Sequence, residues 1–506
     1  MWILLPGAGY CSQTQARISC PNCNVILVSL DTLRADVLGV YGYHRATSPN
    51  MDRLARMGAV FLNAYVQSPN TFPSHMSIFT SQYSWTHKAE VFSKDRLAQK
   101  TMTLPMALKK YGYRTVWAAS GDDTHLSLKA GFERGFDDFA FPAPSGLLNS
   151  TWESAFSWLK KNEGRKFFMF LHTRRIHAPY TPEKKSSILQ FSQFIPRSKI
   201  MTHKELNLLV LQKIDETPSR IFPEAVIKAN PEIFAITDPG RKWTEVRELA
   251  KSNMQSSHAF IILASKIFWE RFDVNSPEDI AYLRILYDAG VFEADMMIGS
   301  LYARLQDLGL ADNTILVITA DHGEEFIEHG QLQHNRLYNE HLHVPLIFIF
   351  PGQRIGRRPA QIVQSIDIAP TILDAVGLSP QAGGEGKSLL PLMEGGASDS
   401  GAMTFARWNG DYAVRDGRFT YIRRPCKERR KWYASWWFPC VTEEFYDRAA
   451  DPGESKNIFS SNKAAAWKFS GHLDEMIKYA EKGVENPWPA GIPDDVRKRI
   501  RETGYW

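Results

Sequence analysis

The chain has 506 residues and a net charge of +5, with 44% hydrophobic and 23% charged residues. This length and composition exclude a small disulfide-stapled scaffold, a mostly disordered chain and a polytopic membrane protein. The net charge is too small over this length to indicate a nucleic-acid partner. We therefore expect a globular protein with one large or about two to four smaller structural units.

Five stretches are predicted to be buried strands because each is a short run of β-branched and other apolar residues: residues 24–30, 115–119, 167–172, 314–319 and 344–350. Apolar residues at helical spacing predict intervening helices at residues 49–57, 76–80, 104–110, 151–161 and 287–308. Strands that alternate with helices are typical of an α/β fold with a mostly parallel sheet flanked by helices.

The pattern divides the chain into an N-terminal extension, a large α/β unit and a C-terminal unit, with boundaries at residues 1–23, 24–378 and 379–506. Helical segments at 202–213 and 243–268 interrupt the strand rhythm in an insertion at about 183–279. This insertion is either a lid that selects substrate or a helical excursion without a role. The last unit, rich in Trp and Tyr, is predicted to be a smaller α+β subdomain with antiparallel strands.

Cysteine usage says little about redox compartment. Cys20 and Cys23 could be a redox pair, half of a metal site or incidental thiols; we favour incidental thiols because no second pair lies at zinc-ribbon spacing. Cys426 and Cys440 could be joined by a disulfide if the protein is exported.

No run of about 18 apolar residues predicts a membrane span. The expected compartment is therefore open: cytoplasmic, or exported to the periplasm if the start is a trimmed leader.

Polar side chains follow two of the predicted strands. Asp31 comes directly after the first strand, and Asp321 and His322 come after the strand at 314–319. The carboxyl ends of parallel strands meet at one edge of a sheet, so these side chains can meet there. Thr71 lies in a proline-flanked loop at 68–75. Taken singly, Asp31 could be a helix cap and Thr71 an N-cap hydroxyl; together they indicate a candidate metal site.

Motifs along the chain resemble the sulfatase branch of the alkaline phosphatase superfamily. They are Ser-Leu-Asp-Thr-Leu-Arg-Ala-Asp (29–36), Thr-Phe-Pro-Ser-His-Met-Ser-Ile-Phe-Thr (71–80), His-Ala-Pro-Tyr (177–180), Thr-Ala-Asp-His-Gly-Glu-Glu-Phe (319–326) and Leu-Tyr-Asn-Glu-His-Leu-His-Val-Pro-Leu-Ile (337–347). The similarity continues at 365–374 and 445–454. It covers most of the chain except the insertion, and it implies an alkaline phosphatase-like fold.

The resemblance also implies roles for individual residues. Asp31, Asp321 and His322 match metal ligands, and Thr71 takes the position of the nucleophile, which also binds the metal. Sulfatases carry Cys or Ser there, within a Cys/Ser-x-Pro-x-Arg signature, and oxidise it to formylglycine. This sequence departs from the signature at Thr71 and at His75, which replaces the Arg. The extra methyl group of a threonine prevents formation of the aldehyde.

A threonine used directly is a poor nucleophile unless a cation lowers the pKa of its hydroxyl. Related enzymes with a threonine nucleophile act on phosphoesters, so the resemblance favours hydrolysis of phosphate diesters or phosphonate monoesters through a covalent threonine intermediate, with sulfate esters as side substrates. The alternatives are an arylsulfatase-type sulfuric ester hydrolase, a phospho-group transferase and a non-catalytic binding module. The expected partner is a small-molecule phosphoester, phosphonate or sulfate ester. The sequence does not decide whether the protein forms an oligomer.

Three histidines are candidates to assist the reaction. His177 and His334 lie where the family places groups that bind the transferred anion or protonate the leaving oxygen. A histidine pKa near neutral would suit general acid catalysis at His334. His75 is expected to orient the nucleophile loop. We predict one divalent metal ion, with zinc or manganese favoured over calcium or magnesium because one ligand is a nitrogen.

Overall fold

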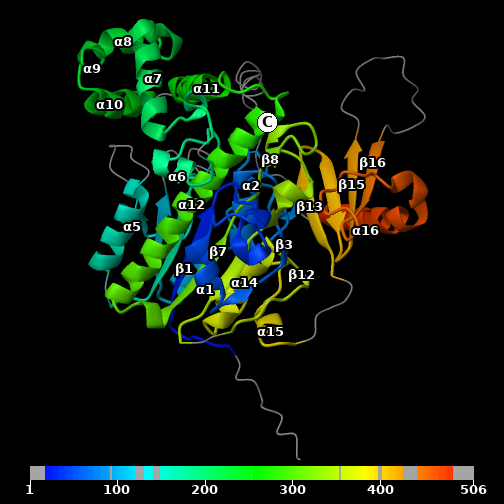
Figure 1. Cartoon of the computed structure of the whole chain (residues 1–506). Coiled ribbons are helices and arrows are strands. Elements are labelled where there is room, and N and C mark those ends of the chain that lie inside the picture. Colours follow the sequence, from blue (N-terminus) through cyan, green and yellow to red (C-terminus); the bar gives the residue numbers. More distant parts are fainter. Residues whose placement is uncertain are drawn as a thin grey trace, which may run out of the picture.

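A seven-stranded sheet forms the centre of the protein (Figure 1), with strand order β2-β11-β7-β1-β6-β4-β5. The computed structural model describes residues 18–91, 94–119, 130–140, 149–162, 164–192, 194–251, 254–352, 355–396, 402–425 and 441–481. The pairs among β7, β1, β6, β4 and β5 are parallel, whereas β11 is antiparallel to β2 and β7. The strands are β1 (Asn24–Leu30), β2 (Ala59–Val60), β4 (Arg114–Ala119), β5 (Asp138–Ala140), β6 (Phe167–Thr173), β7 (Thr314–Thr319) and β11 (Leu346–Ile349). The predicted α/β fold is confirmed.

Helices cover both faces of this sheet, and alternate residues of β1 serve the two faces. Ile26 and Val28 belong to one core cluster, which also contains residues of α1 (Pro49–Ala55), α5 (Asn149–Lys161) and α12 (Pro277–Asp307). Val25 and Leu27 belong to a second cluster, with residues of α2 (Thr71–Thr80), α4 (Leu104–Lys110) and α14 (Ile368–Ala375). All seven residues of β1 are buried, as a strand covered on both sides requires.

Short elements surround the sheet. A three-stranded sheet has the order β10-β3-β12, and β8 pairs with β9. The bounds are β3 (Asn63–Tyr65), β8 (Glu325–Phe326), β9 (Leu332–Gln333), β10 (His343–Val344), β12 (Ile362–Gln364), α3 (Ser84–His87), α13 (Asn339–Leu342) and α15 (Leu390–Met393). Among the described residues, no helix is both long enough and apolar enough to span a bilayer.

Four predicted elements differ from the structure by more than a few residues at their ends. The helix predicted at 287–308 is α12, which begins ten residues earlier, at Pro277. The helix predicted at 76–80 begins at Thr71, because Pro73 fits the first turn of a helix as well as a loop. The strand predicted at 344–350 is divided at Pro345 into β10 and β11, which belong to different sheets. The segment 243–268 lies in two helices, α10 (Pro239–Lys251) and α11 (Met254–Trp269), rather than one.

The insertion forms a group of helices beyond α12, at the upper left of Figure 1. They are α6 (Lys185–Leu189), α7 (His203–Glu216), α8 (Glu224–Ala229), α9 (Pro231–Phe234), α10 (Pro239–Lys251) and α11 (Met254–Trp269). The ring of Tyr180, in the His-Ala-Pro-Tyr motif, lies 6.1 Å from that of Phe268 and 6.0 Å from that of Trp269. The end of α11 therefore packs against a segment that carries candidate site residues.

The C-terminal unit is an antiparallel sheet with the order β13-β14-β15-β16, covered by α16. Its elements are β13 (Thr404–Trp408), β14 (Asp411–Arg415), β15 (Phe419–Pro425), β16 (Val441–Asp447) and α16 (Lys463–Glu481). Phe405, Val414 and Phe445 pack with Phe469 and Leu473 of the helix. The predicted α+β character of this subdomain is confirmed.

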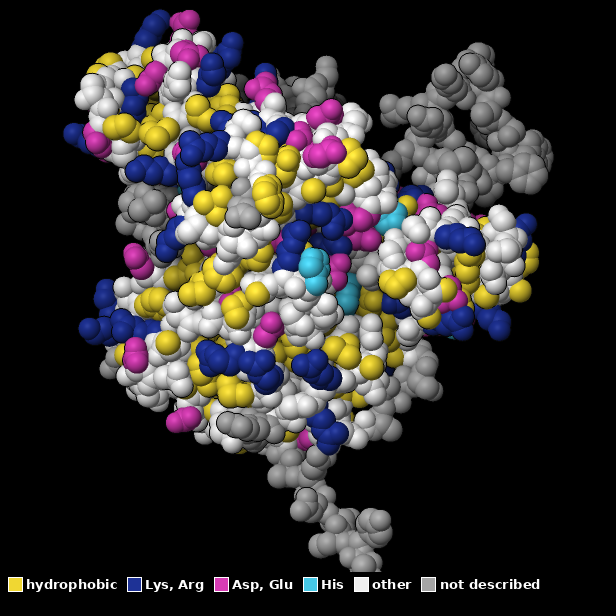
Figure 2. All heavy atoms as spheres, viewed as in Figure 1, with side chains coloured by type: hydrophobic (Ala, Val, Ile, Leu, Met, Phe, Trp, Pro, Cys, Tyr) yellow, Lys and Arg dark blue, Asp and Glu magenta, His cyan; other side chains and the backbone are white. Residues whose placement is uncertain are grey.

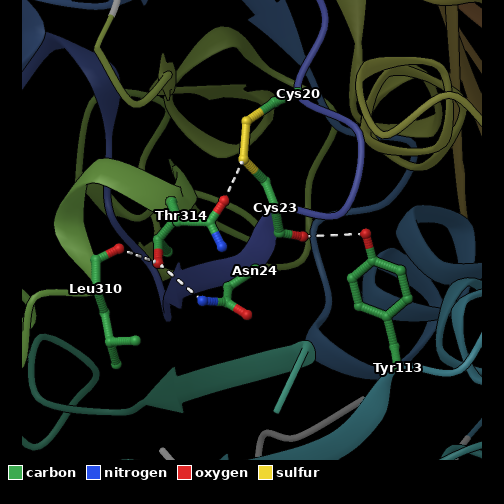
Figure 3. The surroundings of a disulfide bond; sticks show 7 residues. Cys20, Cys23, Asn24, Tyr113, Leu310 and Thr314 are labelled. Carbon is green, nitrogen blue, oxygen red and sulfur yellow. Dashed lines mark hydrogen bonds between the residues drawn. A yellow bond between two sulfur atoms is a disulfide. The ribbon is translucent and has the colours of Figure 1, made fainter. Parts of the chain in front are cut away.

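A disulfide joins Cys20 and Cys23 just before β1 (Figure 3). The expectation of incidental thiols is therefore wrong: the chain turns between the two cysteines, with the Cys23 N–H donating to the Cys20 carbonyl at 3.1 Å. The Tyr113 hydroxyl donates to the Cys23 carbonyl at 3.0 Å. These bonds anchor the amino end of β1, opposite the end that carries Asp31. Cys426 and Cys440 lie outside the described residues.

Candidate active site

Asp31, Asp321 and His322 come together at the carboxyl ends of two neighbouring strands. β1 pairs with β7 so that Ser29 faces Thr319, which places the residues two positions later side by side. His322 Nε2 lies 3.7 Å from Asp31 Oδ1 and 3.5 Å from Asp321 Oδ2. All three side chains are buried. The structure thus brings together the residues that the sequence indicated as metal ligands.

Thr71 is the first residue of α2 and faces this cluster. Its Oγ1 lies 3.3 Å from His322 Nε2. The Ser74 hydroxyl, in the first turn of the same helix, donates to the Asp321 carbonyl at 2.5 Å. This bond joins α2, which carries Thr71, to the loop that carries Asp321. The Thr71 hydroxyl is therefore held against the cluster.

The bare carboxylate oxygens of the cluster fit a divalent cation. Both Oδ atoms of Asp31 and Oδ2 of Asp321 are buried and accept no hydrogen bond. Burial, followed by the charge of Asp321, raises the pKa of Asp31 above its usual range. Buried carboxylates without hydrogen bonds are costly unless a positive charge compensates them. Oxygen and nitrogen atoms 3.5 to 3.7 Å apart can all bind one ion at about 2.0 to 2.2 Å.

His322 is oriented as a metal ligand usually is. Its Nδ1 donates to the Gly323 carbonyl at 2.9 Å, which leaves the lone pair of Nε2 directed at Asp31, Asp321 and Thr71. A hydrogen bond from the distal ring nitrogen to a carbonyl commonly fixes the tautomer of a ligating histidine. Burial lowers the pKa of His322 to about 3, so the ring is neutral and able to bind a cation.

His75, at the position of the signature Arg, holds the backbone of the nucleophile. Its Nδ1 donates to the Thr71 carbonyl at 2.8 Å, and its Nε2 accepts from the Ser29 hydroxyl at 2.9 Å. Burial lowers its pKa well below the usual range. The neutral ring thus connects the first turn of α2 to the end of β1.

His172 was not predicted to be part of the site. It lies on β6 opposite Ser29 of β1, and its Nε2 is 3.8 Å from Asp31 Oδ2. Ligand atoms of His75, His172 and Asp321 lie within 4.8 Å of one another. The available signal was its position at the end of a predicted buried strand at the same sheet edge. The imidazoles of His75 and His172 therefore lie 3.9 and 3.8 Å from the carboxylates of Asp321 and Asp31, respectively.

His177 and His334 also lie beside the cluster. The His334 ring centroid is 4.3 Å from that of His322 and 5.3 Å from that of His177. His334 Nδ1 donates to Glu324 Oε1 at 3.1 Å. Burial lowers the pKa of His334 to about 3, so the ring is neutral rather than poised near pH 7 as the sequence suggested. Glu324 therefore contacts one of the candidate site residues directly.

Gly323→Ala should disrupt this edge of the sheet. A Cβ at Gly323 would lie 1.9 Å from the Glu340 carbonyl oxygen, and backbone there must move to make room. We expect a loss of about 1–3 kcal/mol in the free energy of unfolding and a lower metal content, because the residue follows Asp321 and His322. Denaturant unfolding and metal analysis check this. Gly417→Ala, where a Cβ meets nothing within 4 Å, is the control; equal effects of the two variants would contradict the prediction.

The family model described as Sulfatase matches residues 23–378. The chain belongs to the sulfatase family. A second model, described as the C-terminal part of N-sulphoglucosamine sulphohydrolase, matches residues 327–479 of this family member. The family is metal-dependent and hydrolyses esters, in agreement with the cluster and with the predicted membership of the alkaline phosphatase superfamily.

Curated relatives of this sulfatase-family chain carry sulfatase names. Arylsulfatase K of Gallus gallus is 26% identical over 98% of this chain and 89% of its own length. An N-acetylglucosamine-6-O-sulfatase of Bacteroides thetaiotaomicron is 24% identical over 92% of this chain and 87% of its own. These relatives favour the arylsulfatase-type alternative over the phosphate diester and phosphonate monoester interpretation drawn from the sequence.

Solved structures share the fold. BT4656, solved in complex with its substrate D-glucosamine-2-N,6-O-disulfate, has a TM-score of 0.65 and 20% identity over 92% of this chain and 100% of its own. The phosphonate monoester hydrolase of Agrobacterium radiobacter has a TM-score of 0.62 and 19% identity over 92% of this chain and 100% of its own. One fold thus accommodates sulfur and phosphorus substrates, so fold alone does not choose between them.

Proposed function

We propose that this protein hydrolyses sulfate esters of small molecules, with Thr71 as the nucleophile and one divalent cation held by Asp31, Asp321 and His322. The observation that carries the proposal is the 3.3 Å distance between Thr71 Oγ1 and His322 Nε2 beside the two buried carboxylates. The sulfatase names of the curated relatives support sulfate as the transferred group. The intact cluster supports an enzyme rather than a binding module.

Two carboxylates, one imidazole and one hydroxyl favour zinc or manganese over calcium and magnesium. When bound, such a cation lowers the pKa of the Thr71 hydroxyl and polarises the ester. Thr71 Oγ1 gives up its proton and forms a bond to sulfur while the bond from sulfur to the leaving oxygen breaks. The leaving oxygen takes up one proton, which balances the one that the hydroxyl lost. Water hydrolyses the resulting threonine sulfate ester and releases sulfate. His334 is the candidate to contact the leaving oxygen, and His177 lies beside it, with the two ring centroids 5.3 Å apart.

A second candidate function is hydrolysis of phosphate diesters or phosphonate monoesters. It is favoured by Thr71 itself, because a threonine side chain cannot become the formylglycine aldehyde of sulfatases proper, and a direct hydroxyl nucleophile suits phosphoryl transfer. Sulfate monoesters, phosphate diesters and phosphonate monoesters all present tetrahedral centres with one negative charge. The same site could therefore accept them as minor substrates.

A panel of p-nitrophenyl esters tests the proposal. The purified protein, supplied with zinc or manganese, is assayed on p-nitrophenyl sulfate, bis-p-nitrophenyl phosphate, p-nitrophenyl phenylphosphonate and p-nitrophenyl phosphate. We expect the highest kcat/KM for the sulfate and loss of activity in chelator-treated protein. A phosphate diester or phosphonate that leads clearly would reverse the order of the two candidates. Absence of turnover on every ester would contradict the proposed hydrolase.

A further inference from the structure

Arg174 lies at the edge of the candidate active site. It follows Thr173, the last residue of β6, whose carbonyl accepts a hydrogen bond from the Asp31 N–H at 3.0 Å. Its Nε is 3.6 Å from Asp31 Oδ2. The side chain is 16% exposed, whereas that of Asp31 is 1% exposed. The guanidinium therefore extends from the buried carboxylate toward the surface.

We infer that Arg174 binds the non-bridging oxygens of the substrate's tetrahedral anionic group, and that His177 positions its guanidinium for this contact. The inference rests on the proposed function and names the residue that would recognise the anion. A planar guanidinium can donate two parallel hydrogen bonds to an oxyanion, whereas a lysine ammonium offers only a point charge.

The hydrogen bonds of His177 support a positioning role. Its Nδ1 donates to the Ala178 carbonyl at 2.5 Å, so Nε2 is the nitrogen that can accept. An Arg174 terminal nitrogen lies 3.1 Å from His177 Nδ1 and 3.3 Å from Nε2. A guanidinium only donates, so with the hydrogen on Nδ1 it can donate only to Nε2. With both ring nitrogens engaged, His177 orients the arginine instead of giving a proton to the leaving oxygen.

The neighbouring Arg175 makes contacts of a different kind from those of Arg174. Arg175 forms an ion pair with Glu293 of α12 and donates to the Thr181 carbonyl at 3.0 Å, and its side chain is 1% exposed. It fastens the segment after β6 to α12. Arg174, one residue earlier, is directed to the cluster instead. On the face shown in Figure 2, Lys, Arg and His side chains lie next to Asp and Glu side chains between the insertion and the C-terminal sheet.

Sulfate affinity tests the inference without relying on turnover. Inorganic sulfate is titrated calorimetrically into metal-loaded wild type, Arg174→Met and Arg174→Lys. We expect the Met variant to weaken sulfate binding about 10- to 100-fold, as the loss of a charge-assisted hydrogen-bond donor pair does, and the Lys variant to lie between. For the ester that the enzyme cleaves fastest, the Met variant should raise KM more than it lowers kcat.

Two further variants complete the design. Arg336→Met is the matched control, because Arg336 donates to the Gln331 side chain and the His329 carbonyl instead; its sulfate affinity should equal that of wild type. His177→Ala should weaken sulfate binding in wild type and add little in the Arg174→Met background, as expected for two residues that act together.

The outcomes separate this inference from the proposed function. Equal sulfate affinity in wild type and Arg174→Met, at equal metal content, would overturn the inference even if wild type hydrolyses sulfate esters. Sulfate binding that depends on Arg174 in a protein that cleaves no ester would contradict the proposed function and leave the anion site standing. If the Met variant does not fold, wild-type affinity in the Lys variant decides against the bidentate contact.

Discussion

Thr71→Val is expected to lower kcat/KM by about 10⁴-fold or more, the scale seen when a nucleophile is removed. Valine keeps the shape of threonine and lacks only the hydroxyl. The Thr71 hydroxyl contacts His322 Nε2 at 3.3 Å, and Asp31, Asp321 and His322 remain in the variant to hold the cation, so the fold and most of the metal content should be kept. Steady-state kinetics on the best ester of the panel, with metal analysis of the same sample, measure the effect.

Thr71→Ser is the matched control for that loss. Serine keeps the hydroxyl 3.3 Å from His322 Nε2 and removes only the methyl group, so we expect activity within about 100-fold of wild type. Mass spectrometry of the denatured protein after a short reaction should detect a sulfated or phosphorylated peptide containing residue 71 in wild type and not in Thr71→Val. A valine variant with wild-type turnover would exclude Thr71 as the nucleophile.

Asp321→Asn is expected to abolish stoichiometric metal binding and to lower activity by about 10³-fold or more, while it stabilises the metal-free protein. Burial raises the pKa of Asp321 from 3.8 to about 6. A carboxyl group with a raised folded-state pKa stabilises the fold below its unfolded pKa, and this contribution is lost as pH rises through about 6. At pH 8 the buried Asp321 carboxylate is charged and destabilises the metal-free fold. The neutral amide of asparagine removes this destabilisation, so the free energy of unfolding should rise by about 1–3 kcal/mol.

The hydrogen bonds of Asp321 allow the effect of the lost charge on stability to be measured by itself. Oδ1 accepts from the backbone N–H groups of Thr32 and His322 at 3.2 and 3.0 Å, and an asparagine oxygen can keep both bonds. Thermal unfolding of chelator-treated protein should show a higher Tm for Asp321→Asn at pH 8 and a difference that shrinks toward pH 4. Asp312→Asn, at an exposed position before β7, should change neither metal content nor Tm. Full metal binding by Asp321→Asn would remove it from the ligand set.

The sequence predicted the parts of the site that follow strongly patterned strands. Asp31, Asp321 and His322 come directly after continuous apolar runs, and the parallel arrangement of α/β sheets brings such ends together. His172 and Arg174 lie at the end of the predicted strand at 167–172, so the same argument applied to them, but neither residue belongs to a motif that marked it. Their closeness to Asp31 became visible only with the pairing of β6 and β1.

Strand direction and helix starts were harder to predict for a similar reason. Leu346–Ile349 is as apolar as its neighbours, yet it pairs antiparallel with β7, and composition does not report direction. Thr71 was placed in a loop because two prolines flank it, although proline fits the first turn of a helix. The histidine pKa values depend on burial, which only the packed structure reveals.

All ten residues of α2 are buried, and this has a consequence for how a reaction cycle can run. A helix that is buried along its whole length is not expected to move during turnover, so Thr71 Oγ1 keeps its position in the fold. Substrate entry and product exit must then be accommodated by the surrounding segments, and turnover by this protein depends on how readily those segments let molecules pass.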